Sequence, residues 1–261
     1  MTATSAGEFA GQSVIVVGAS GALGSATARS LAALGARVTM SGANGQRLAE
    51  LEREITASGG AVTVINLRPD TEQNANAIVA AAVGAFGEVS GLVVASGANI
   101  VAPIIEMSVD QFDTVMNTNV RNSWLVCRAF GAHLLGAGVA GSVVIVTSTR
   151  ALLGHSAGYS AYCSSKGAEN LLTRTLAAEW GASGIRVNAV APTVFRSDLT
   201  AWMYGDDERA TKTREGMLAR IPLGRLAETD DVVGPALFFL SEAARFVTGQ
   251  ILYVDGGYTA C

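Results

Sequence analysis

Tyr162 and Lys166 lie four residues apart in GYSAYCSSKGAENLLTRTLAAEW, whose apolar spacing predicts a long helix. At that spacing the two side chains share one face of the helix. A phenol titrates near pH 10, so its use as a base at neutral pH requires lowering its pKa by about three, roughly 4 kcal/mol. A neighbouring ammonium group does this by favouring the phenolate. The pair predicts proton transfer by Tyr162; the alternative is an exposed lysine beside a half-buried tyrosine.

Other polar side chains precede this pair at places where a site is expected. Ser148 follows a predicted strand, fourteen residues before Tyr162, and its hydroxyl could bond a substrate oxygen as that oxygen gains charge. Asn119 is a poor helix former in a helical stretch, so we expect it to bend the helix by bonding backbone or water. Of the two histidines, we interpret His133 as helix surface and His155 as a substrate-side contact.

A glycine-rich turn, VGASGALG, directly follows the first predicted strand and opens the first helix. Glycines in such a turn let the backbone approach a pyrophosphate, which the free N–H groups and the positive end of the helix stabilise. A packing turn is the alternative in a chain with 30 glycines. The candidate dinucleotide contacts in this turn are Gly18, Ser20, Gly21, Leu23 and Gly24.

The second predicted strand ends in Met40-Ser41-Gly42-Ala43-Asn44, without the acid that would bond a ribose 2′-hydroxyl. The missing acid removes a repulsion against a 2′-phosphate, which Ser41, Asn44, Arg47 or Arg68 could contact. The cofactor is therefore expected to be NAD or NADP, with NADP favoured. For Arg47, an ordinary place on a helix surface is an equally good interpretation.

Apolar runs alternate with Ala- and Leu-rich segments of helical spacing along the whole chain. The predicted strands are Val14–Val17, Val38–Met40, Val62–Leu67, Leu92–Ala95, Val143–Val146, Val187–Ala191 and Gln250–Val254. The predicted helices are Ala22–Leu34, Gln46–Ser58, Ala75–Phe86, Ser108–Leu135, Tyr162–Gly181 and Asp231–Leu240. Continuous apolar strands indicate a parallel sheet covered on both faces, so we expect one α/β domain over residues 1–261 with a doubly wound sheet, the Rossmann fold.

The segment Thr193–Arg220 interrupts this alternation, and an interruption of that length predicts a functional loop or lid. It carries Phe195 and Trp202, which indicate a substrate with apolar or ring surface; packing against a neighbouring subunit is the alternative.

Composition excludes several classes of function. The formal charge is −4 and there are only two lysines, so no basic patch for nucleic acid or an anionic membrane is expected. Three widely spaced cysteines without C-x-x-C or histidine spacing argue against a disulfide framework or a metal site. No apolar stretch reaches membrane-spanning length, and the first residues do not look like a signal peptide. We expect a cytoplasmic enzyme acting on a small molecule.

These motifs, in this order, resemble the short-chain dehydrogenase/reductase family, over nearly the whole chain through GQILYVDGGYTA. The resemblance implies an NAD(P)-dependent oxidoreductase in which Tyr162 is the general acid/base and Lys166 lowers its pKa and binds the ribose. It also implies that Ser148 orients the substrate oxygen and that Asn119 holds a water of a proton relay. The further cofactor contacts that it implies are Leu67, Ser96, Gly97, Pro192, Val194 and Ser197. A homotetramer is implied as well.

The chain departs from the family pattern mainly on the cofactor side. Val17 and Ala22 alter the T-G-x-x-x-G-x-G turn, and Leu67, followed by Arg68, replaces an acid. Val94-Ala95-Ser96-Gly97 stands for N-N-A-G, and Ser148 is one residue farther from Tyr162 than usual, so Thr149 competes for its role. Two alternatives stay open: a 3-oxoacyl-carrier-protein reductase and a non-catalytic cofactor-binding relative.

Overall fold

The fold is taken from a computed structural model that describes residues 7–197 and 200–261. Its strands are β1 (Ser13–Val17), β2 (Arg37–Ser41), β3 (Ala61–Ile65), β4 (Gly91–Val94), β5 (Gly141–Val146), β6 (Ile185–Pro192) and β7 (Ile251–Val254). Its α-helices are α1 (Ala22–Ala33), α2 (Gly45–Ala57), α3 (Glu72–Phe86), α4 (Val109–Met116), α5 (Asn122–Ala137), α6 (Ser160–Trp180), α7 (Glu208–Leu218) and α8 (Thr229–Leu240).

The strands form one parallel sheet in the order β3-β2-β1-β4-β5-β6-β7. Strand order reverses between β1 and β4, which is the switch point where open α/β sheets bind ligands, beyond the carboxyl ends of the strands. The predicted doubly wound parallel sheet is confirmed.

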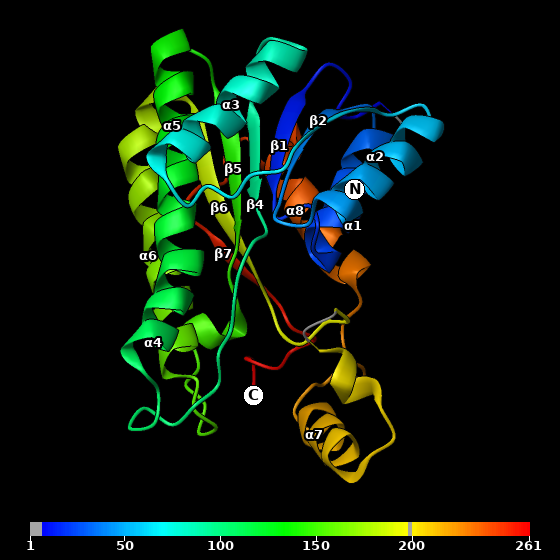
Figure 1. The fold of residues 1–261 in the computed structure, drawn as a ribbon, viewed down its shortest axis with the longest axis vertical. Helices are drawn as coiled ribbons and strands as arrows, with labels where there is room; N and C mark the ends of the chain where they lie inside the picture. Colours follow the sequence, from blue (N-terminus) through cyan, green and yellow to red (C-terminus); the bar gives the residue numbers. More distant parts are fainter. Residues whose placement is uncertain (1–6, 198–199) are drawn as a thin grey trace.

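Alternate residues of each strand face two separate cores. Val14 and Val16 of β1 pack against α1, α2 and α8, whereas Ile15 and Val17 pack against α3, α5 and α6. Figure 1 shows these two helical layers on opposite faces of the sheet. Because both faces are buried, the central strands β1 and β4 are apolar almost throughout, with Ser13 as the exception, and this near-continuous apolar run is the pattern that predicted them.

One predicted helix is interrupted. The segment expected as a single helix over Ser108–Leu135 consists of α4, a π-helical turn at Asn117–Arg121 and α5. Asn119 lies in the middle of this turn, where its side chain bonds the backbone of another segment. The wider turn is therefore the local bend expected at Asn119.

The segment expected as a lid follows β6 and contains a short 3₁₀ turn (Ala201–Tyr204) and α7. Figure 1 shows α7 apart from the two helical layers. Residues 198–199 of that segment lie outside the described residues. Within the described ranges, no helix combines the length and apolar character needed to cross a membrane. The same ranges contain no cluster of three or more metal-ligating His, Cys, Asp or Glu side chains.

Candidate active site

The structure places Tyr162 and Lys166 together on the first turns of α6, beside the carboxyl end of β5. The Lys166 Nζ lies 5.9 Å from the centre of the Tyr162 ring. Lys166 is buried, and its ammonium donates to the carbonyl oxygen of Val146, the last residue of β5, at 3.0 Å. This contact ties the ammonium to the strand end and keeps its positive charge beside the phenol ring.

A buried carboxylate that the sequence analysis did not identify supports this lysine. Glu169 Oε2 accepts a hydrogen bond from Lys166 Nζ at 2.7 Å, and Glu169 Oε1 accepts one from Ser123 Oγ of α5 at 3.0 Å. Burial alone would lower the pKa of Lys166, but the charge of Glu169, together with Tyr162, raises it above its usual value. The ammonium therefore stays protonated. The spacing of three residues between Lys166 and Glu169 on one helix was a signal for this pair.

We predict that Glu169→Gln lowers the free energy of unfolding by about 3 kcal/mol, because it leaves a buried ammonium without its anionic partner. Urea denaturation measures the change. Glu179→Gln, at an exposed position near the end of the same helix, is the control and should stay close to wild type. Equal free energies of unfolding for wild type, Glu169→Gln and Glu179→Gln would contradict the role of Glu169 as the anionic partner of Lys166.

Asn119 lies next to the same lysine. Its Oδ1 accepts from the backbone N–H of Ala98 at 2.7 Å, and its Nδ2 donates to the carbonyl oxygen of Ala98 and to Ser165 Oγ, at 3.0 and 2.8 Å. Ser165 in turn donates to the carbonyl oxygen of Tyr162. A Cβ added at Gly97 would lie 3.4 Å from Asn119 Oδ1 and 3.5 Å from Lys166 Nζ. The exposed Gly97 thus leaves open space directly above both groups.

Ser148 and Thr149 lie in the segment that connects β5 to α6. The Ser148 hydroxyl accepts from the backbone N–H of Arg150 at 3.1 Å, which fixes the oxygen and leaves its hydrogen free to donate. Ser148 keeps 7% of its surface exposed, against 2% for Thr149. The geometry therefore favours Ser148 over Thr149 as the hydroxyl that meets a ligand.

The glycine-rich turn between β1 and α1 packs tightly against the segment after β4. Gly18 has φ +87°, and a Cβ there would lie 2.6 Å from Ser96 N and 2.7 Å from Ala95 C. Gly24 tolerates no Cβ either, because the Gly18 backbone occupies that space. The N–H groups of Gly18 and Ala19 donate to the carbonyl oxygen of Ser41. The turn is thereby held at the switch point of the sheet, with Leu23 buried and Ser20 and Gly21 toward the surface.

The side chains expected to contact a 2′-phosphate are not equally available. Ser41 is fully buried and its hydroxyl donates to the carbonyl oxygen of Leu67 at 2.7 Å, so we withdraw it as a phosphate contact. Asn44 caps α2 by accepting from the backbone N–H of Arg47. Arg68 is exposed at the end of the β3 segment, beside the half-buried Leu67. Sequence spacing does not distinguish an exposed strand end from a buried one, which explains the error at Ser41.

The remaining expected cofactor contacts lie at neighbouring strand ends. Pro192 ends β6 and is buried, while Val194 and Ser197 follow it and are half-buried. After β4, Ser96 Oγ and Asn99 Oδ1 are buried and have no hydrogen-bond partner within the described ranges. Unpaired buried polar atoms beside a glycine turn fit a polar ligand that lies between β1 and β4.

Residues expected on the substrate side lie around the opening of the site. The His155 and Tyr159 ring centres are 4.6 Å apart, and those of Tyr159 and Tyr162 are 6.3 Å apart. Burial, with the charges of Arg150 and Arg220, lowers the pKa of His155. In the segment expected as a lid, Phe195 packs against the hydrophobic core that includes residues of α8. Trp202 is exposed, and the guanidinium of Arg209 lies over its ring. Trp202 thus remains a candidate substrate contact, and Phe195 fixes the base of the segment.

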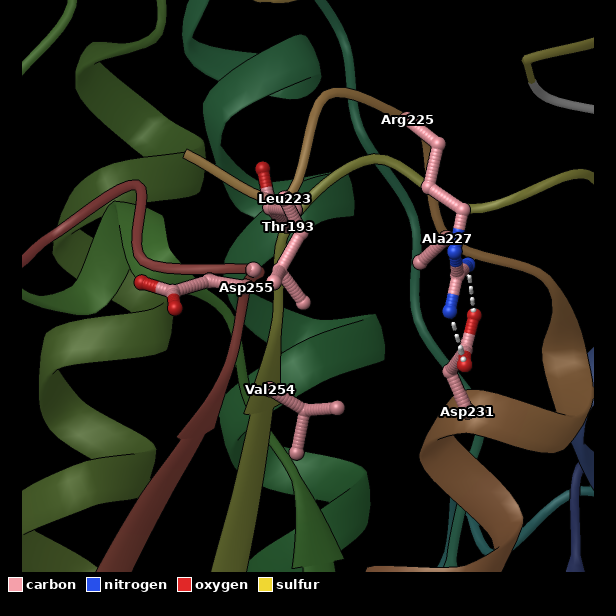
Figure 2. Close-up of a pocket in the computed structure, with 8 residues that line it drawn as sticks. Thr193, Leu223, Arg225, Ala227, Asp231, Val254 and Asp255 are labelled. Atoms are coloured by element: carbon pink, nitrogen blue, oxygen red, sulfur yellow. Dashed lines mark hydrogen bonds and ion pairs between the residues drawn. The ribbon is translucent and has the colours of Figure 1, made fainter. Parts of the chain in front are cut away.

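A pocket of about 130 Å³ lies at the base of this segment. Figure 2 shows two of its lining residues, Thr193 and Val254, at the ends of β6 and β7. A bidentate ion pair between Arg225 and Asp231 closes one side, at 2.6 and 2.8 Å. The Asp255 carboxylate turns away to bond the N–H groups of Gly257 and Thr259. The polar groups of this pocket are thus used in fixing the segment to α8 and to the C-terminal tail.

The Arg225–Asp231 pair makes stability depend on pH. Hydrogen bonds from Arg225, and then from the backbone N–H of Glu228, lower the pKa of Asp231 to about 2. This stabilisation is present above the ordinary carboxyl pKa near 4 and is lost as the pH falls toward 2. We predict that Asp231→Asn lowers Tm at neutral pH by about 2–4 °C, because it removes the negative charge that accepts from Arg225 and from the backbone N–H of Glu228.

Thermal unfolding at a series of pH values measures this effect, and the gap between wild type and Asp231→Asn should close between about pH 5 and pH 2. Asp230→Asn, in the same first turn of α8 but exposed, is the control with little expected change. If the difference in Tm between wild type and Asp231→Asn stays constant down to pH 2, the ion pair is not the cause of that difference.

The chain is similar to known oxidoreductases over almost its full length. A family model described as enoyl-(acyl carrier protein) reductase matches residues 18–259. An uncharacterized oxidoreductase of Mycobacterium tuberculosis, Rv1714, is 55% identical over 96% of this chain and 92% of that protein. Human L-xylulose reductase is 39% identical over 69% of this chain and 72% of its own length.

Two solved structures have the same fold. A short-chain type dehydrogenase/reductase from Mycobacterium ulcerans is 30% identical, with a TM-score of 0.90 over 97% of this chain and 91% of that one. A candidate NAD(P)-dependent gluconate 5-dehydrogenase from Beutenbergia cavernae, solved with NADP at low occupancy, is 36% identical. Its TM-score is 0.89, over 98% of this chain and 100% of that chain.

Proposed function

Because the chain belongs to the short-chain dehydrogenase/reductase family, we propose that it transfers a hydride between NAD(P)(H) and a carbonyl or secondary alcohol carbon, with Tyr162 as general acid/base. The observation that carries this proposal is the buried Lys166 ammonium, 5.9 Å from the Tyr162 ring and fixed to the end of β5. A non-catalytic binding protein would have no need of an ammonium held beside a phenol.

The residues present fit a dinucleotide. Gly18 leaves no room for a side chain against the segment after β4, and Gly24 leaves none against the backbone of the turn itself. Ser96 Oγ has no partner within the described residues. We assign the pyrophosphate to the turn at Gly18–Gly24, the ribose to Lys166 beside Gly97, and the nicotinamide side to Pro192, Val194 and Ser197. When bound, the cofactor supplies or accepts the hydride.

In the reduction direction, Ser148 donates a hydrogen bond to the carbonyl oxygen and Tyr162 protonates that oxygen as it gains charge. Lys166 stabilises the phenolate that remains. Asn119 holds the π-helical turn beside this path, where a water could return the proton to Tyr162. Oxidation of an alcohol follows the same path in reverse.

For the cofactor, we propose NADP in preference to NAD. No acid follows β2, and the exposed Arg68 at the end of the β3 segment suits a 2′-phosphate. For the substrate, relatives named for L-xylulose and gluconate support a secondary alcohol of a sugar or polyol. Three free cysteines suit a reducing compartment, so we propose a cytoplasmic location.

The test has two steps. Titration of the protein with NADPH and NADH, followed by nicotinamide fluorescence, should show binding of both, with tighter binding of NADPH. Turnover of a panel of polyols, ketoses and cyclic alcohols should then follow with the preferred cofactor. Binding without any turnover would contradict the enzymatic proposal and favour a cofactor-binding role.

A second candidate is a 3-oxoacyl-carrier-protein reductase. The matching family model, described as enoyl-(acyl carrier protein) reductase, shares with it the acyl-carrier thioester but not the 3-oxo group. This candidate predicts higher kcat/KM on 3-oxoacyl thioesters of the carrier protein than on free ketoses. Comparing the two substrate classes at equal enzyme concentration decides between the candidates.

We further propose that the protein is a homotetramer. A shallow apolar groove of about 540 Å³ runs between the α4–α5 segment and α6, and it includes Trp124 and Leu171, which are 48% and 64% exposed. Phe246, beside the edge strand β7, is fully exposed. The groove and the exposed Phe246 support interfaces with further copies of the chain.

We predict that Leu171→Arg reduces the assembly from four copies to two, because an arginine would be buried unpaired in the groove interface. Light scattering after gel filtration measures the mass. Ala57→Arg adds the same charge at an exposed position of α2, on the other face of the sheet, and should leave the mass unchanged. A wild-type monomer, or no change with Leu171→Arg, would contradict this interface.

A further inference from the structure

Two arginines lie on one buried aromatic ring beside the proposed substrate site. The Cζ atoms of Arg150 and Arg220 lie 5.8 and 4.2 Å from the centre of the Tyr258 ring. Tyr258 is only 1% exposed. Arg150 follows β5, Arg220 follows α7, and Tyr258 belongs to the tail after β7. Three segments distant in sequence therefore bring two positive charges together, and Figure 1 shows the tail running between α6 and the α7 segment.

These charges have little to pair with in the protein. Arg150 makes two long hydrogen bonds, 3.3 Å each, to the Gly154 carbonyl and to Tyr258 Oη. Within residues 7–197 and 200–261, the Arg220 side chain makes no hydrogen bond, and neither arginine pairs with a carboxylate. Stacking on Tyr258 holds the guanidinium of Arg220 in place while its N–H donors stay unused. Two guanidinium groups on one ring, neither paired with a carboxylate of the described residues, indicate a place for an anion.

Arg150 also lies near the reacting groups. The Cζ of Arg150 lies 5.9 Å from the centre of the Tyr159 ring, which neighbours the Tyr162 ring. His155 stacks on the same Tyr159 ring, and the charges of Arg150 and Arg220 contribute to the lowered pKa of its imidazole. A neutral imidazole adds a hydrogen-bonding group that does not compete for an anion. The Tyr159 ring therefore lies near both Arg150 and Tyr162.

We propose that Arg150 and Arg220 bind an anionic group, a carboxylate or a phosphate ester, at the far end of the substrate, and so select acidic polyols over uncharged ones. This inference rests on the proposed function, because the reacting carbon of the substrate must reach Tyr162 while the anionic group of the same molecule lies on the two arginines. A carbon chain of several atoms, such as a sugar acid or a sugar phosphate, meets both demands.

Direct binding tests the site without turnover. Inorganic phosphate is titrated calorimetrically into wild type, Arg150→Met, Arg220→Met and Lys212→Met, each saturated with NADP so that the cofactor's own phosphate contacts are occupied. Lys212, exposed on α7, is the control for loss of a lid charge. We expect one phosphate site in wild type and Lys212→Met, and about 10- to 100-fold weaker binding in each arginine variant. Equal affinities in all four proteins, or no binding by wild type, would overturn the proposal.

Kinetics test selection and identify the kind of anion. A polyol, the sugar acid and the sugar phosphate of equal chain length are compared by kcat/KM. We expect wild type to prefer one charged substrate by about 10-fold or more, and each arginine variant to lose that preference. Arg220→Lys should keep part of it. Equal kcat/KM for charged and uncharged substrates in wild type refutes the inference while hydride transfer stands. If no substrate is turned over, the proposed function is contradicted. The phosphate titration alone then tests the anion site.

Discussion

Replacing Tyr162 by phenylalanine should reduce turnover by about 10²- to 10⁴-fold while leaving cofactor affinity nearly unchanged. The reason is that only the hydroxyl is removed. The ring keeps its place against Tyr159 and below the Lys166 ammonium, whose bonds to Val146 and Glu169 do not involve the phenol. Steady-state kinetics and nicotinamide fluorescence measure the two quantities separately.

Tyr253→Phe, which removes a hydroxyl from the edge strand β7, is the matched control and should retain wild-type turnover. Two outcomes would refute the role of Tyr162. In one, Tyr162→Phe turns over as wild type does. In the other, turnover and cofactor binding are lost together, which would mean that the phenol acts only in binding.

Replacing Gly18 by alanine should abolish measurable cofactor binding and destabilise the fold. An alanine at φ +87° is strained by about 1–2 kcal/mol, and its Cβ would lie 2.6 Å from the backbone nitrogen of Ser96. The turn and the β4 segment must then move apart, and with them the N–H groups that would meet the pyrophosphate. Fluorescence titration gives the affinity, and thermal unfolding gives the stability.

The control is Gly84→Ala in α3, where an added Cβ meets nothing within 4 Å. This change should leave cofactor binding intact and stabilise the protein by about 0.5–1 kcal/mol, because alanine favours the helix. If Gly18→Ala bound NADPH as tightly as Gly84→Ala does, the glycine turn would not be the pyrophosphate site.

Much of this architecture follows from local sequence pattern. The apolar runs of β1 and β4 to β6 mark strands buried on both faces, and the four-residue spacing of Tyr162 and Lys166 sets them on one helical face. Both features depend only on residues near one another in the chain. They were therefore predicted, with strand and helix ends shifted by a few residues.

Contacts between distant segments were not predictable in this way. Glu169 matters because Ser123 of another helix bonds its second oxygen, and Ser41 is withdrawn as a phosphate contact because the Leu67 carbonyl accepts its hydrogen bond. The anion site joins Arg150, Arg220 and Tyr258 from three segments. Apart from the three-residue spacing of Lys166 and Glu169 on α6, no spacing along the chain indicates these contacts, since they depend on how distant segments pack together.

Transfer of a labelled hydride tests the central claim most directly. NADPH deuterated at the transferred position is mixed with wild type and each ketose or 3-oxoacyl thioester of the panel in a single turnover, and the products are analysed by mass spectrometry. The account predicts deuterium on the carbinol carbon of at least one product, and at least 100-fold slower transfer with Tyr162→Phe. Label that never leaves bound NADPH, or that leaves equally fast with Tyr162→Phe, would contradict it.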